Sequence, residues 1–191
     1  MGRDDDRILT LTQCFAQRFG HRPHVVARAP GRVNLIGEHT DYNGLPVLPM
    51  AVDRTVLVAG APREDARIEL ANLDPAFPPR SYELAPVIPP FPPGDWGNYH
   101  KAAVQGLVSL LRPAALGGGD FLVAGNIPAG AGLSSSAALL VGSALALLAV
   151  HDRNLSVRDC HRLAEVLHGF LTDIFQNRPP ASGSQNKPAL I

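Results

Sequence analysis

The sequence has few cysteines, no excess of charge of either sign and no long apolar run, and each absence excludes a class of protein. Its 191 residues include only two cysteines, Cys14 and Cys160, and no CxxC or Cys/His cluster, which argues against a disulfide scaffold and a zinc site. The 17 Lys and Arg residues balance the 17 Asp and Glu residues, so the composition offers no basic field for nucleic acid.

Signals for export or membrane insertion are also missing. The first ten residues are acidic and lack the apolar core of a signal peptide, and no run approaches the roughly 18 to 20 apolar residues of a membrane span. Together with the scarcity of cysteine, this pattern predicts a cytoplasmic protein that binds neither nucleic acid nor a membrane.

What the sequence does contain is a series of apolar patterns typical of one mixed domain. Ile8, Leu11, Phe15 and Phe19 recur at spacings of three and four, which predicts an amphipathic helix. Runs of β-branched and apolar residues between turn formers predict strands, and a long apolar stretch without proline predicts a buried helix. The expected helices are 7–19, 96–111, 134–151 and 156–174, and the expected strands are 24–29, 33–36, 47–52, 55–59, 67–71, 82–84 and 121–124. Ser156 is the expected N-cap of the last helix, with Asp159 at the capping-box position three residues on.

Prolines are concentrated between Pro75 and Gly94. Because proline lacks a backbone N–H and is excluded from the middle of a sheet, only a short edge strand at 82–84 can form there. We expect the segment to be an ordered surface excursion rather than a linker between domains.

A glycine- and serine-rich segment, residues 125–138, stands between a predicted strand and the predicted buried helix. In such a position a ligand phosphate can meet backbone N–H groups and the positive end of a helix. Gly130 and Gly132 would let the backbone approach a ligand, and the serines at 134–136 offer hydroxyls to phosphate oxygens or a metal. The segment lacks the lysine of a Walker A motif. The alternative is a turn that only caps a helix, for which one hydroxyl suffices.

A second polar segment, residues 29–44, lies among predicted strands and is broken by two glycines. Its Glu38 and Asp41 carboxylates would accept hydrogen bonds from sugar hydroxyls, and Arg32 would donate several in a fixed geometry. These side chains therefore suit a site for a small neutral sugar. The alternative is a solvated hairpin whose charges pair with one another.

Taken together, the two segments resemble the galactokinases of the GHMP kinase family. GRVNLIGEHTDYNG (31–44) is similar to the galactokinase signature, and PAGAGLSSSAA (128–138) is similar to the second GHMP-kinase motif, in the same order. The resemblance runs from about Phe15 to about Glu165. It implies an α+β fold of the ribosomal protein S5 domain 2-like type, with a mostly antiparallel sheet packed with helices. It also implies that ATP and D-galactose are the substrates, galactose 1-phosphate and ADP the products, and Mg²⁺ the cofactor.

The resemblance assigns roles to single residues as well. Arg32 matches the arginine that stabilises the transition state. The residues that match the sugar-binding positions are Glu38, His39, Thr40 and Asp41. Those that match the ATP loop are Gly130, Ala131, Gly132, Leu133, Ser134, Ser135 and Ser136. Ser136 and Glu165 match the metal ligands, although an isolated helical glutamate such as Glu165 would otherwise face solvent. Trp96 matches a residue near the nucleotide, although core packing alone would explain it.

The resemblance stops after Glu165. The Met-Asp-Gln segment that supplies the family's catalytic base is not found, and Asp173, between Thr172 and Ile174, does not match it, so no base is assigned. The family's third, glycine-rich motif is also missing. We therefore expect a galactokinase-like N-terminal domain over 1–175, a disordered tail over 176–191, and impaired or no turnover by this chain alone.

Two further expectations follow from these departures. Apolar surface that a C-terminal domain would cover predicts self-association. The alternatives to galactokinase activity are a non-catalytic module that binds galactose or ATP, and a related sugar kinase that uses N-acetylgalactosamine or L-arabinose.

Overall fold

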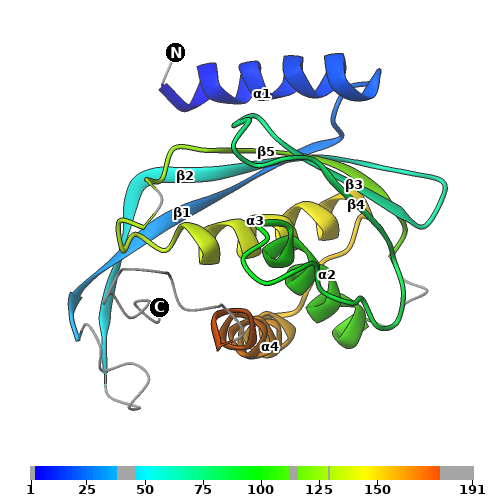
Figure 1. Ribbon diagram of the computed structural model, residues 1–191. Helices are drawn as coiled ribbons and strands as arrows, with labels where there is room; N and C mark the ends of the chain where they lie inside the picture. Colours follow the sequence, from blue (N-terminus) through cyan, green and yellow to red (C-terminus); the bar gives the residue numbers. More distant parts are fainter. Residues whose placement is uncertain (1–2, 38–45, 112–115, 129, 177–191) are drawn as a thin grey trace.

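The computed structural model describes residues 3–37, 46–111, 116–128 and 130–176 (Figure 1). Its helices are α1 (Arg3–Phe19), α2 (Gly97–Leu111), α3 (Ser135–Val150) and α4 (Val157–Gln176). Its strands are β1 (Val25–Ile36), β2 (Leu48–Pro62), β3 (Arg67–Asn72), β4 (Arg80–Glu83) and β5 (Gly119–Gly125). Among these residues no helix is both long and apolar enough to cross a membrane. Of the tail expected over 176–191, Gln176 is the last residue of α4, and 177–191 lie outside the described residues.

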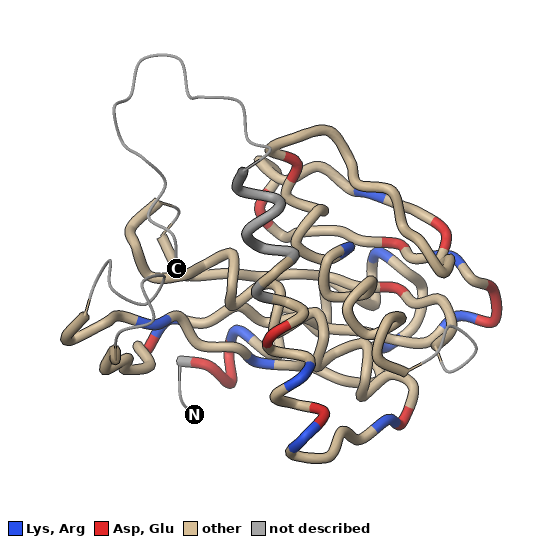
Figure 2. The backbone as a smooth tube through the Cα atoms, turned by 90° about the horizontal axis from the view of Figure 1, so that it is seen from below, with Lys and Arg blue, Asp and Glu red and all other residues tan. Residues whose placement is uncertain are grey.

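The five strands form one sheet in the order β1-β2-β5-β3-β4, in which only the β3–β5 pair is parallel. The mostly antiparallel α+β architecture expected from the resemblance is thus confirmed. Helix α1 covers one face of the sheet, α2 and α3 cover the other, and α4 packs outside them against α2 (Figure 1). Basic and acidic residues intermingle along the described backbone, as the balanced composition requires (Figure 2).

The core has two layers because alternate residues of a strand point to opposite faces. On β2, Leu57 belongs to the cluster with Phe15 of α1, whereas its neighbour Val58 belongs to the larger cluster with Leu140 of α3. All four side chains are buried. Since both faces are covered, β2 is buried continuously from Thr55 to Ala61 rather than in alternation.

The long β1–β2 pairing corrects the strand prediction. A break at Pro30-Gly31 is wrong: β1 runs through both residues, and β2 is one strand where two were expected. The register shifts instead, with Pro30 opposite Thr55 but Arg32 opposite Ala51. Proline is tolerated because β1 is an edge strand of the sheet. The irregularity in the pairing is therefore a local bulge and not the end of a strand.

The helix predictions hold apart from their ends. Helix α1 begins at Arg3, four residues earlier than expected, and the acidic residues 4–6 of its first turn suit the positive end of a helix. At the start of α4, the Asp159 amide donates to Ser156 Oγ at 3.2 Å, and that hydroxyl donates to the Asp159 carboxylate at 2.7 Å. Ser156 is thus the N-cap that the sequence predicts.

The proline-rich excursion is fastened along α2 by side chains of the helix. The Asn98 amide group accepts from Phe91 N at 2.8 Å and donates to Phe91 O at 3.2 Å. Lys101 Nζ donates to Pro89 O at 2.7 Å and lies 3.4 Å from the centre of the Phe91 ring. One turn further along α2, the Gln105 amide group accepts from Ile88 N at 2.7 Å and donates to Pro86 O at 3.1 Å. Helix side chains thus replace the ladder hydrogen bonds that prolines cannot make.

One histidine of α2 is enclosed in the core. His100 has no exposed surface, its ring centre lies 4.9 Å from that of Phe121, and its Nδ1 shares a 2.8 Å hydrogen bond with the Tyr82 hydroxyl. Nε2 has no partner among the described residues. Burial disfavours the imidazolium and lowers the pKa of His100 from 6.5 to about 3.

This burial predicts a pH-dependent stability. Between about pH 6.5 and pH 3 the unfolded chain binds a proton at His100 that the folded chain excludes, so stability falls as the pH falls through this window, by at most about 1.4 kcal/mol per pH unit. His100→Asn keeps an acceptor for Tyr82 without a titrating ring. Urea unfolding at pH 7, 6 and 5 should show a smaller loss of stability in this variant.

The control is His161→Gln, because His161 is exposed on α4. It should keep the pH dependence of the original chain. An unchanged dependence in His100→Asn would refute the assignment.

Candidate functional site

The loop between β5 and α3 has a backbone suited to an anion. Gly130, Gly132 and Ser134 have φ of 71°, 70° and 60°, whereas Ala131 and Leu133 between them have no positive φ. Such alternation turns successive N–H groups into one concavity, a common binding site for phosphates. A Cβ at Gly130 or Gly132 would meet no atom of the described residues within 4 Å, so these residues leave the loop open on that side. Helix α3 begins at Ser135, directly after Ser134, and adds the positive end of its dipole.

The entry of this loop is anchored to the sheet and, through it, to α1. Asn126 Oδ1 accepts from Thr55 N at 2.7 Å, and Asn126 N donates to Thr55 O at 3.2 Å. Arg7 of α1 donates to both the hydroxyl and the carbonyl of the same threonine, at 2.7 and 3.1 Å. Arg7, Thr55 and Asn126 were not predicted as site residues, because no local sequence pattern links residues that lie so far apart along the chain. The asparagine after a buried strand was the only available signal.

The exit of the loop lies against β1. A Cβ at Gly31 would stand 2.7 Å from the carbonyl oxygen of Leu133, so only glycine fits there without a shift of the backbone. The next residue, Arg32, donates its backbone N–H to the same carbonyl at 3.1 Å. Its guanidinium Nη1 donates to Ser134 Oγ at 2.6 Å. The two segments singled out from the sequence therefore meet at Arg32.

Ser134 is the N-cap residue of α3, but its side chain makes no capping hydrogen bond. Its backbone is left-handed, with φ 60° and ψ 40°, which costs a residue with a Cβ about 1 to 2 kcal/mol. The side chain is buried and bonded to Arg32 instead. The capping interpretation of the serines thus does not apply to the hydroxyl of Ser134.

The other predicted residues lie as follows. Ser135 and Ser136 are half-buried in the first turn of α3, and Glu165 is exposed on α4. The predicted sugar-binding residues, Glu38, His39, Thr40 and Asp41, lie outside the described residues. Trp96 is buried, and its Nε1 donates to Pro78 O at 2.9 Å, as the core-packing interpretation expects.

The predicted metal ligands can be tested only by their chemistry. No group of three or more His, Cys, Asp or Glu that could hold a metal occurs in the part of the chain that the structure describes. Mg²⁺, however, is commonly held by one or two protein oxygens, by waters and by substrate phosphates. Ser136, in the first turn of α3, offers one hydroxyl, and Glu165, on α4, offers one exposed carboxylate, and both are oxygen donors of the kind that this mode of binding uses.

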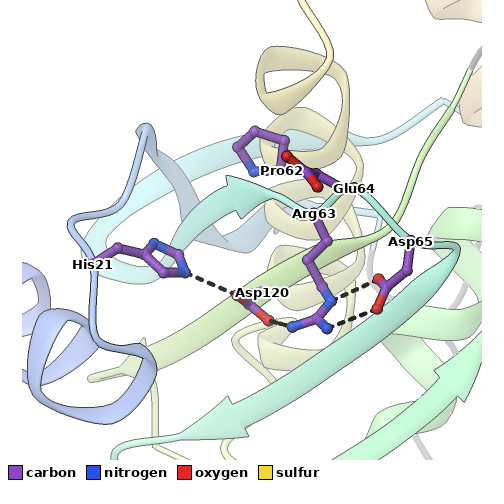
Figure 3. Close-up of a pocket in the computed structure, with 6 residues that line it drawn as sticks. All are labelled: His21, Pro62, Arg63, Glu64, Asp65 and Asp120. Carbon is purple, nitrogen blue, oxygen red and sulfur yellow. Dashed lines mark hydrogen bonds and ion pairs between the residues drawn. The ribbon is translucent and has the colours of Figure 1, made fainter.

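A separate polar pocket lies at the opposite end of β5, around Asp120 (Figure 3). The buried Asp120 carboxylate bonds His21 Nε2 at 3.0 Å and Arg63 Nη1 at 2.9 Å. Arg63 also forms two hydrogen bonds of 2.8 Å with Asp65, which lower the pKa of that carboxyl to about 2 and raise that of the guanidinium. The dashed bonds in Figure 3 join the Arg63 guanidinium to both carboxylates and His21 to Asp120, so this cluster ties His21 and the residues around Arg63 to β5.

The approach of β1 to the loop predicts the effect of Gly31→Ala. The added Cβ would stand 2.7 Å from Leu133 O and 3.2 Å from side-chain carbons of Val52 and Ile127. Because the nearest atom belongs to the backbone, the loop must move, and we expect a loss of about 1–3 kcal/mol of stability in urea unfolding. Gly125→Ala is the control, since its nearest neighbour is 3.8 Å away. Equal stability of the two variants would contradict the close contact.

Comparison with known proteins agrees with this geometry. Residues 13–62 match the galactokinase galactose-binding signature, and residues 98–175 match the N-terminal domain of the GHMP kinases. A galactokinase of Chloroflexus aurantiacus is 42% identical over 148 residues, which are 78% of this chain and 37% of the relative. The galactokinase of Schizosaccharomyces pombe is 34% identical over 211 residues, covering 97% of this chain and 39% of the relative. The chain thus spans about two fifths of the length of these relatives.

Solved structures show the same architecture. The crystal structure of Lactococcus lactis galactokinase complexed with galactose superposes with a TM-score of 0.72 at 31% identity, covering 87% of this chain and 42% of that one. The mevalonate kinase of Methanococcus jannaschii has a TM-score of 0.66 at 22% identity over 81% of this chain and 48% of that one, which supports the fold alone. Residues 13–62 thus carry the galactose-binding signature of the galactokinases, and residues 98–175 carry the N-terminal domain of the GHMP kinases.

Proposed function

We propose that the chain supplies the sugar-binding and phosphate-binding parts of a galactokinase-type active site. There the γ-phosphoryl group of ATP passes to D-galactose, giving galactose 1-phosphate and ADP. The observation that supports this most is the 2.6 Å hydrogen bond from Arg32 to Ser134, two residues separated by 102 positions. It joins β1, which lies within the galactose-binding signature, to the loop that suits a phosphate.

On this proposal the loop and Arg32 act by binding and orienting the triphosphate. The backbone N–H groups of 130–134 and the N-terminus of α3 donate hydrogen bonds to phosphate oxygens, and these donors are already oriented before the reaction. A guanidinium carries five N–H donors, so Arg32 can bind Ser134 and a phosphoryl oxygen together. Charge spreads over the transferring phosphoryl oxygens in the transition state, and a fixed cation stabilises that charge.

The sugar would be held by the segment that follows β1. Glu38 and Asp41 would accept hydrogen bonds from galactose hydroxyls, with His39 and Thr40 completing the polar set. Arg32 lies on β1, before this segment, and its backbone N–H donates to Leu133 O of the phosphate loop. That contact fixes the start of the sugar segment relative to the phosphates, which is what transfer between two bound substrates requires.

Ser136 and Glu165 are the residues that we propose to hold Mg²⁺, through a hydroxyl and a carboxylate oxygen. When bound with ATP, the ion would neutralise charge on the phosphates. Exposure of Glu165 leaves its carboxylate accessible to such a complex.

Three wider expectations also remain proposals. The first is that residues 1–175 act as one domain, and the second is a location in the cytoplasm. The third is self-association, which exposed apolar side chains at the β1–β2 ends support. Leu35, Ile36, Leu48 and Met50 are each about half exposed or more.

The proposal predicts that the chain binds both D-galactose and Mg-ATP in calorimetric titrations. Asp41→Asn should weaken galactose binding by about 10- to 100-fold while leaving Mg-ATP binding unchanged, because a carboxylate that accepts a sugar hydroxyl is replaced by an amide. D-Glucose serves as the control sugar. Absence of heat with both ligands would contradict the proposal.

A coupled assay of ADP release on the same sample separates the remaining functions. Binding of both ligands without ADP release would favour a non-catalytic module. Preference for N-acetylgalactosamine or L-arabinose over galactose would favour a related sugar kinase.

A further inference from the structure

Ser134 occupies a backbone conformation that the rest of the loop assigns to glycine. The other two left-handed positions, 130 and 132, are glycines, whereas position 134 carries a side chain at φ 60°. Asp152 is the other non-glycine residue with a positive φ in the described parts of the chain. A strained conformation that glycine would relieve indicates that the side chain itself is needed there.

The hydroxyl of Ser134 does not serve the helix that it precedes. It makes no capping bond, although its own carbonyl accepts from Ala138 N at 2.9 Å as the first bond of α3. Its partner is Arg32 Nη1, at 2.6 Å. The left-handed backbone thus brings the Oγ atom to the guanidinium rather than to the N–H groups of the first turn.

Arg32 is a residue that needs such support. Its side chain is long and loses much rotamer freedom when it is fixed, and it stands where the β1–β2 pairing is irregular. A backbone bond to Leu133 O fixes its main chain only. Ser134 adds a second hydrogen bond, at the guanidinium. Because a hydroxyl is neutral, it orients the guanidinium without cancelling the charge that a phosphoryl group would meet.

We propose that Ser134, through its side chain, is a positioning residue for Arg32, and that its hydroxyl is not a direct ligand of the nucleotide. The proposal rests on the function proposed above, and it separates Ser134 from the neighbouring serines. Its hydroxyl holds the guanidinium at the exit of the phosphate loop, so that the arginine is in place before the nucleotide binds. The strain at Ser134 persists because glycine would remove this hydrogen bond to the guanidinium.

The test begins with the ligand-free chain and the arginine-selective reagent phenylglyoxal, read by peptide mass spectrometry. In Ser134→Gly, the rate of modification of Arg32 should rise severalfold relative to exposed Arg54 in the same sample. Thermal stability should stay equal or rise, because glycine relieves the left-handed backbone. Ser134→Asn, which tolerates this conformation and offers a side-chain oxygen, should restore protection of Arg32.

The matched control is Asp152→Gly, which relieves the same kind of strain at the other end of α3. It should stabilise the chain without changing the reactivity of Arg32. Equal reactivity of Arg32 in the original chain and in Ser134→Gly would overturn the proposal, and so would failure of Ser134→Asn to protect it.

Titration with Mg-ATP then connects the contact to function. Ser134→Gly should weaken binding by about tenfold, and Ser134→Asn should recover most of it. Unchanged affinity in Ser134→Gly would show that positioning of Arg32 does not serve the nucleotide and would overturn that part. If the original chain does not bind Mg-ATP, the proposed function fails, while the reactivity of Arg32 still decides whether Ser134 holds it.

Discussion

The close approach of an edge strand to a loop carbonyl is the constraint on which the rest of the site depends. The backbone at Gly31 lies so near to Leu133 O that a methyl group would not fit between them. This contact places the backbone N–H of Arg32 on the same oxygen and its guanidinium on Ser134. It is a direct contact between the strand of the galactose signature and the phosphate loop, in addition to the connection that both have through β2.

The surrounding fold holds this contact rigidly. Both faces of the central strands are buried, so β2 and β5 can shift little, and the loop begins from them through the Asn126–Thr55 pair. Helix α3 is packed on the sheet and fixes the other end of the loop. Among the described residues of the loop, Ser134 alone combines a side chain with a positive φ, and it lies at the point where the loop meets the arginine. Stored strain of this kind is characteristic of functional sites.

Much of the fold could be predicted from the sequence because periodicity and capping are local. The amphipathic pattern of 7–19 gave α1, and the Ser156–Asp159 box gave the start of α4. Pro30 misled the strand prediction, since a bulged edge strand accommodates a proline that a central strand would not. The pairing of β1 with β2 determines where β1 ends, and local sequence patterns do not predict such long-range pairing.

The candidate site was predictable in its parts but not in its connections. Two specific motifs named the segments and most of the residues. They could not show that Arg32 bonds Ser134 across 102 positions, or that Arg7 of α1 supports the loop through Thr55. Contacts of this kind depend on tertiary packing. For the same reason, the choice between capping and another role for Ser134 needed the left-handed geometry of its backbone.

The central claim is that Arg32 stands between a sugar site and a phosphate site. It is tested most directly by following the backbone amide resonances of Arg32 and Gly132 in the ¹⁵N-labelled chain during separate titrations with D-galactose and Mg-ATP. The account predicts that the Arg32 resonance shifts with both ligands and that the Gly132 resonance shifts mainly with Mg-ATP. An Arg32 resonance that neither ligand moves would contradict it.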